Sequence, residues 1–89
     1  MKSCRCIIKG RVQGVWFRKY TQEVANKLGI FGEVKNLADG SVEVKASFDE
    51  QVKEEFLKAL KKGPPLARVD EIVYEEIDET FTTPFRIVR

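Results

Sequence analysis

The stretch from Gly10 to Arg18 constrains the fold of this 89-residue chain more than any other. Gly10 and Gly14 separate a run of alternating apolar residues from a segment with helical spacing. A glycine-punctuated turn between a strand and a helix leaves backbone N–H groups free to point into one concavity, at the positive end of the helix. Main-chain donors in that geometry hold a phosphate or a carboxylate. The stretch therefore predicts an anion-binding loop, with the planar guanidinium group of Arg18 closing over the anion.

A purely structural turn is the alternative interpretation of this stretch. Short motifs match by chance, and a Gly-x-x-x-Gly connection in front of a helix is often only a tight turn. The stretch is not a P-loop, because no Gly-Lys-Ser/Thr follows it, and it lacks the Gly-x-Gly-x-x-Gly pattern of dinucleotide sites. On spacing alone, both the structural turn and the anion site remain open.

Length and charge limit what kind of protein this is. Eighty-nine residues make a single domain over positions 1–89, near the lower end of sizes that fold without a disulfide or metal. The net charge is only +2, whereas a nucleic-acid binder usually has a stronger basic bias. No apolar run approaches the roughly 18 residues of a membrane span, and the N-terminus lacks a signal-peptide core. We expect a cytoplasmic monomer with no nucleic-acid or membrane partner.

The two cysteines, Cys4 and Cys6, lie on one face of a predicted strand because they are two residues apart. At a strand rise of about 3.3 Å per residue, their Cα atoms are roughly 6.6 Å apart, at the upper edge of disulfide reach. Two thiols do not make a zinc site, and the chain has no histidine to complete one. We expect buried free thiols that pack as small hydrophobic side chains.

Alternating apolar residues predict strands over residues 4–9, 30–36, 42–48 and 69–77, and a short final strand over 85–88. The second and third strands form an antiparallel hairpin, since the turn between them has Gly40 to supply a positive φ. The third strand alternates most cleanly and is expected to be half-buried, with Glu43, Lys45 and Ser47 on its solvent side.

Helical spacing predicts a first helix over residues 17–28, ended by a left-handed Gly29. A second helix follows Ser47 and Glu50, which have capping-box spacing, with Asp49 as an alternative N-cap. The element order is thus β-α-β-β-α-β plus a short strand. This order is typical of an α+β ferredoxin-like sandwich, an antiparallel sheet with two helices on one face.

Few residues of this chain can carry out chemistry. The lack of histidine excludes a histidine-based triad or a histidine-ligated metal, and the acidic residues fall on positions predicted to face solvent. What remains is Arg18, the main-chain donors and Asn36, an amide near the end of the second strand whose plainer interpretation is a turn residue.

Such a set suits a reaction with an easy leaving group. An acyl phosphate expels a carboxylate whose conjugate acid has a pKa of about 4, so no general acid is required. Phosphoryl transfer then depends on positioning and on stabilising charge, which an arginine, N–H groups and a water-holding amide can supply.

Two long motifs resemble the signatures of the acylphosphatase family. The first is Gly10-x-Val12-Gln13-Gly14-Val15-x-Phe17-Arg18, and the second is Gly32-x-Val34-x-Asn36-x-x-Asp39-Gly40-x-Val42-Glu43. The resemblance covers nearly the whole chain. It implies a ferredoxin-like acylphosphatase that hydrolyses small-molecule acyl phosphates, which are carboxylic-phosphoric anhydrides, to a carboxylate and inorganic phosphate. Water attacks in line, with no cofactor, no metal and no covalent phosphoenzyme.

The resemblance also implies the roles of individual residues. Arg18 and Asn36 are the catalytic residues: Arg18 binds the phosphate and Asn36 orients the attacking water. Two positions depart from the family's usual pattern, Glu33 where an aromatic residue is more common and Trp16 where a smaller residue or Phe is common, and both bear on substrate access. The loop that binds phosphate consists of Arg11, Val12, Gln13, Gly14, Val15, Trp16 and Phe17.

Two other classes of function stay open from the sequence. One is a non-catalytic phosphate- or RNA-binding ferredoxin-like module, although residues 4–9 and 41–48 lack the exposed stacking rings of an RNA-binding sheet. The other is a free-standing relative of the acylphosphatase-like domain that occurs in carbamoyl-handling maturation enzymes. The length of the chain favours a free-standing enzyme.

Overall fold

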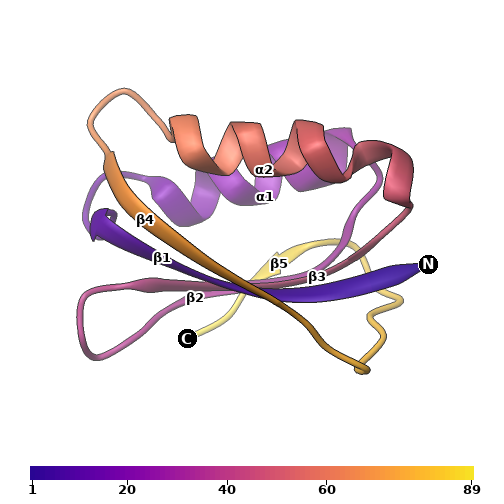
Figure 1. Ribbon diagram of the computed structural model, residues 1–89. Coiled ribbons are helices and arrows are strands. Elements are labelled where there is room, and N and C mark those ends of the chain that lie inside the picture. The colour runs from indigo at the N-terminus through magenta and orange to yellow at the C-terminus, as the bar shows by residue number, and fades with distance from the viewer.

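One mixed sheet of five strands forms the protein, with both helices on the same face of it (Figure 1). The computed structural model describes residues 1–89. The elements in chain order are β1 (Lys2–Arg11), α1 (Phe17–Lys27), β2 (Phe31–Asn36), β3 (Val42–Phe48), the 3-10 turn η1 (Glu50–Val52), α2 (Lys53–Lys62), β4 (Arg68–Glu76) and β5 (Arg86–Ile87). The expected α+β ferredoxin-like order is confirmed.

The strand order in the sheet is β4-β1-β3-β2-β5. The pairs β1·β3, β1·β4 and β2·β3 are antiparallel, as expected for the four main strands. The short β5 departs from the expected antiparallel sheet, because it pairs parallel with β2. The chain reverses direction after β4, which runs opposite to β1 and β2, and β5 therefore runs in the direction of β2 at the far edge of the sheet.

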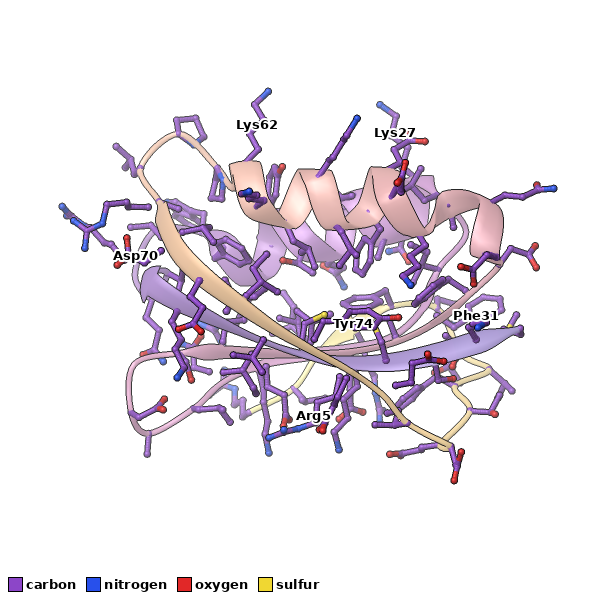
Figure 2. The ribbon with its side chains drawn as sticks, viewed as in Figure 1. Arg5, Lys27, Phe31, Lys62, Asp70 and Tyr74 are labelled. Carbon is purple, nitrogen blue, oxygen red and sulfur yellow. The ribbon has the colours of Figure 1, made fainter.

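The core lies between the helices and the sheet. Its side chains include Phe17 of α1 and Phe56 and Leu60 of α2, all at most 1% exposed. Cys4 and Cys6 are free and fully buried, as predicted, with their Sγ atoms 3.9 Å apart. The lysines that Figure 2 labels on the helices point away from the sheet. Neither helix has the length and apolar character needed to cross a membrane.

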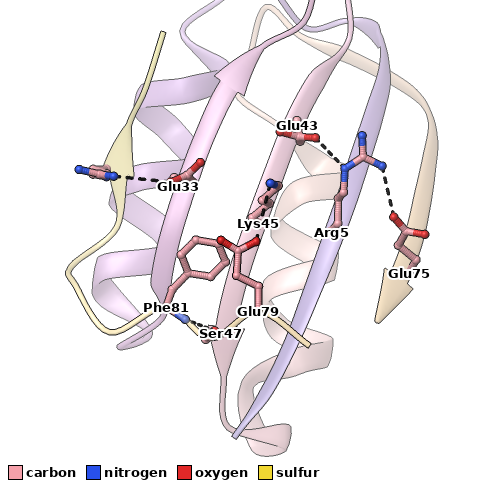
Figure 3. A network of polar contacts seen from close by, with 9 residues as sticks. Arg5, Glu33, Glu43, Lys45, Ser47, Glu75, Glu79 and Phe81 are labelled. Atoms are coloured by element: carbon pink, nitrogen blue, oxygen red, sulfur yellow. Dashed lines mark hydrogen bonds and ion pairs between the residues drawn. The ribbon is translucent and has the colours of Figure 1, made fainter. Parts of the chain in front are cut away.

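The third strand, β3, is buried on both faces, which corrects the predicted half-buried strand. Glu43 and Ser47, expected on the solvent side, are 7% and 0% exposed. Figure 3 shows the contacts on the face away from the helices: Arg5 Nε donates to Glu43 Oε2 at 2.6 Å, and its Nη1 donates to Glu75. The N–H of Phe81, in the segment between β4 and β5, donates to Ser47 Oγ at 2.8 Å. That segment therefore covers part of the face that the sequence pattern left open.

The predicted capping box before the second helix is wrong. The hydroxyl of Ser47 bonds that of Ser3 across the β1·β3 pair, at 2.7 Å, instead of capping a helix. Asp49 does precede η1, but its side chain makes no capping hydrogen bond. The hydroxyl of Ser47 is held by neighbouring strands because the residue still belongs to β3. The capping box therefore does not form, although its spacing is present.

Candidate active site

The β1–α1 loop, residues 12–16, joins the end of β1 to the start of α1. Val12 and Val15 are buried and fix the loop to the core. Gly14 has a φ of 74° and Trp16 a φ of 68°, a left-handed conformation that is uncommon for a bulky residue. The backbone N–H groups of residues 13–19 donate to no acceptor within the protein. The loop thus gathers unpaired donors at the positive end of α1, where an anion is favoured.

The side chain of Gln13 braces this loop against the turn between β2 and β3. Its Nε2 donates to the carbonyl oxygens of Leu37 and Ser41, both at 2.8 Å. The turn is itself closed by the Leu37 N–H, which donates to the Ser41 carbonyl, and by Asp39, which accepts from the N–H and hydroxyl of Ser41. These bonds from Ser41 lower the pKa of Asp39 below its ordinary value of 3.8. The anion-binding loop and the hairpin turn therefore form one hydrogen-bonded unit.

A cavity of about 610 Å³ opens beside the loop. Residues from four parts of the chain surround it: the loop, the first turn of α1, the end of β2 and the segment from β5 to the C-terminal residue. Its lining consists of Val12, Gly14, Trp16, Phe17, Arg18, Lys19, Asn36, Ile87 and Arg89. The lining combines apolar side chains with three cationic side chains and one amide, which suits an anionic ligand.

Asn36 is the last residue of β2 and faces this cavity. Its Oδ1 atom is buried and has no hydrogen-bond partner in the protein. A buried polar group without a partner costs about 1–3 kcal/mol, and an amide that lines a cavity without a partner in the protein is available to a ligand. The strand β3 lies between β1 and β2, which puts the strand leading into the loop and the strand bearing Asn36 two sheet spacings apart, roughly 10 Å.

The structure brings most of the predicted site residues together. Six of them line the cavity: Val12, Gly14, Trp16, Phe17, Arg18 and Asn36. Three others do not. Arg11 is exposed at the end of β1 opposite Arg68, Gln13 points to the hairpin turn, and Val15 is buried in the core. These three residues can bind an anion only through their backbone N–H groups. The side chain of Gln13 supports the loop indirectly, through its bonds to the hairpin turn.

The two positions that depart from the family pattern lie in different places. Trp16 is 78% exposed at the mouth of the cavity. Glu33 instead pairs with Arg86 of β5, at 3.7 Å, and does not line the cavity (Figure 3). Of the two, Trp16 alone is placed to affect substrate access directly.

Sequence reasoning missed three residues of the lining, namely Lys19, Ile87 and Arg89. Lys19 could have been found, because it follows Arg18 directly at the start of the predicted helix. Ile87 and Arg89 carry no local signal. They reach the cavity only because β5 joins the sheet beside β2, about fifty residues away in sequence.

Comparison with known proteins shows which family this chain resembles in sequence and in fold. A sequence model of the family described as Acylphosphatase matches residues 4–87. A relative from Pseudothermotoga lettingae named Acylphosphatase is 48% identical over 81 residues, which are 91% of this chain and 91% of the relative. The crystal structure of an acylphosphatase from Bacillus subtilis is 39% identical, with a TM-score of 0.95 and both chains covered in full. Full-length HypF, in a phosphate- and nucleotide-bound form, is 27% identical with a TM-score of 0.86, over 99% of this chain and 12% of that one.

Proposed function

We propose, given that this chain belongs to the acylphosphatase family and is a hydrolase acting on acyl phosphates, that the reaction takes place in the cavity between the β1–α1 loop and the end of β2. The overall reaction is RCO–O–PO₃²⁻ + H₂O → RCOO⁻ + HPO₄²⁻ + H⁺. The oxygen of water bonds to phosphorus, and the bond from phosphorus to the acyl oxygen breaks with its electron pair leaving on the carboxylate.

The phosphoryl group is held by Arg18 and the loop. Arg18 is the second residue of α1 and lines the cavity, as do Gly14 and Trp16 of the loop. The unpaired N–H groups of residues 13–19 bind the equatorial oxygens, and the guanidinium fork adds charge-assisted bonds. These donors are fixed by the fold before substrate arrives, and preorganised donors are what stabilise charge as it develops in the transition state.

Asn36 orients the attacking water. The observation that carries this role is the position of the Asn36 amide, which lines the cavity and makes no side-chain hydrogen bond within the protein, so the amide group is free to bind a water molecule there. The amide is uncharged, so it fixes the position of the water without competing for the phosphoryl group. The leaving carboxylate needs no proton, because its conjugate acid has a pKa of about 4, and the proton lost from water passes to the phosphate or to solvent.

Replacing Asn36 by alanine tests this assignment. An interaction made only in the transition state lowers kcat and kcat/KM alike, so we expect both to fall by about a hundredfold. The inhibition constant of inorganic phosphate should stay close to that of the parent protein, since the amide carries no charge. Hydrolysis should proceed equally well with a chelator present, because no metal is assigned a role.

A second asparagine provides the matched control. Asn26 Oδ1 accepts a hydrogen bond from the N–H of Phe85, at 3.1 Å, and lies away from the cavity lining. Asn26→Ala should therefore lower the unfolding midpoint with little change in kcat. If Asn36→Ala behaves in the same way, losing stability but keeping full turnover, then Asn36 belongs to the turn and not to the chemistry.

The alternatives drawn from the sequence are not favoured. The relatives named acylphosphatase match over most of their own length, which supports a free-standing enzyme. HypF is matched over only 12% of its chain, so its activity as a whole protein does not transfer.

A further inference from the structure

We infer that the site prefers acyl phosphates whose acyl part carries a second anionic group, and that Lys19 and Arg89 bind this group. The inference rests on the proposed function and adds a substrate class to it. The observation behind it is an excess of positive charge: three cationic side chains line the cavity, and no aspartate or glutamate does.

Lys19 is the third residue of α1 and follows Arg18 directly. Its side chain is exposed, lines the cavity and forms no ion pair within the protein. The first turn of a helix is the end where a cation is least stabilised by the helix dipole. Lys19 is therefore poorly placed for stability and well placed for an anionic ligand.

Arg89 reaches the cavity through the register of the last strand. Val34 of β2 is paired in parallel with Ile87 of β5, and the Val88 N–H donates to the Val34 carbonyl at 2.9 Å. β5 ends at Ile87, and Arg89 follows two residues later, on the side of the sheet edge where Asn36 ends β2. Side chains two residues apart on a strand share a face, so Arg89 follows Ile87 on the cavity side. Arg89 and Asn36 therefore line the same cavity.

The cations of the cavity differ from those on the opposite face of the sheet. There, Arg5 pairs with Glu43 and Glu75, and Lys45 pairs with Glu79 (Figure 3). In the cavity, the phosphoryl group is accounted for by Arg18 and the backbone donors. That leaves Lys19 and Arg89 without an aspartate or glutamate to pair with. A carboxylate or phosphate at the far end of the acyl chain supplies that charge.

The test compares succinyl phosphate with its monomethyl ester, which keeps the chain length but removes the second charge. At low ionic strength we expect kcat/KM to be about tenfold higher for succinyl phosphate. Lys19→Gln and Arg89→Gln should each lower this ratio by three- to fivefold, the worth of one exposed charge pair. Added salt should lower it in the parent protein, since it screens exposed charges. Lys27→Gln, on the same helix but pointing away from the sheet (Figure 2), should keep the parent ratio.

A third substrate, 3-phosphonopropanoyl phosphate, separates the two kinds of anion. A higher kcat/KM than for succinyl phosphate would assign the subsite to phosphorylated acyl groups, and a lower one to dicarboxylic acids. The inference is overturned if the parent protein hydrolyses the ester as well as succinyl phosphate, or if neither substitution changes the ratio. Failure to hydrolyse any of the three substrates would instead overturn the proposed function.

Discussion

The brace made by Gln13 should control both the stability of the protein and the affinity of its anion site. Gln13→Met keeps the size of the side chain and removes its two hydrogen bonds, to the carbonyl oxygens of Leu37 and Ser41. Each carbonyl retains a backbone donor, since Gly40 N–H donates to Leu37 and Leu37 N–H donates to Ser41. No buried acceptor is therefore left without a partner.

The expected loss of stability follows from the two hydrogen bonds that Gln13→Met removes. Two ordinary hydrogen bonds contribute about 0.5–1.5 kcal/mol each, so the free energy of unfolding should fall by about 2 kcal/mol. For a domain of this size, that corresponds to a drop in Tm of roughly 10 °C. Because the loop loses its support, phosphate should inhibit several-fold more weakly, measured below the unfolding range. Gln13→Glu should be worse at neutral pH, since a carboxylate would face two carbonyl oxygens, and should recover partly as the pH falls and the carboxyl group takes up a proton.

The assay measures thermal unfolding and competitive inhibition by phosphate on the same preparations. Gln51→Met is the matched control, because Gln51 is exposed and its side chain makes no hydrogen bond to the protein. Unchanged stability and unchanged phosphate inhibition in Gln13→Met would show that the brace has no role in either property.

Five further substitutions test other parts of the structure. Arg18→Lys should lower kcat/KM by about a hundredfold without unfolding the protein, because a point charge replaces a planar fork; circular dichroism and steady-state kinetics check this. Gly14→Val should weaken phosphate inhibition, since a β-branched residue disfavours a φ of 74°, although no heavy atom lies within 4 Å of the added Cβ. Gly32→Ala should prevent stable folding, because its Cβ would overlap the Lys45 carbonyl oxygen, whereas Gly40→Ala has open space and should lower Tm only modestly. The hydrogen bonds from Ser41 lower the pKa of Asp39 from its ordinary value of 3.8. The ionised carboxylate therefore stabilises the fold above that pH, and this stabilisation is lost as the pH falls through the lowered pKa. In Asp39→Asn, the free energy of unfolding should change less with pH in this acidic range.

Local patterns were sufficient to predict most of the fold. The stripe of α1, the left-handed Gly29 after it and the positive φ of Gly40 all follow from spacing within a few residues. Burial of Glu43 and Ser47 could not be predicted in this way. It depends on Arg5 and on the N–H of Phe81, which lie more than thirty residues away along the chain.

The candidate site likewise has a part that was predicted from sequence motifs and a part that was not. Arg18 and Asn36 were proposed from the two family-like motifs, and both do line the cavity. The brace at Gln13 and the presence of Arg89 were not predicted, because both depend on how distant segments meet: one on the hairpin turn, the other on the parallel register of β5. These contacts depend on the order of the strands in the sheet. That order cannot be predicted from patterns that span only a few neighbouring residues.

The position of β3 between β1 and β2 has a consequence for refolding. The loop and Asn36 are separated by the width of that strand, although both precede it in the chain. A partly folded state with α1 formed but β3 not yet inserted would contain every proposed catalytic group and still lack the spacing between them. Recovery of turnover after dilution from denaturant should therefore follow completion of the sheet, and enzyme activity can serve as the last-reporting probe in a kinetic folding experiment.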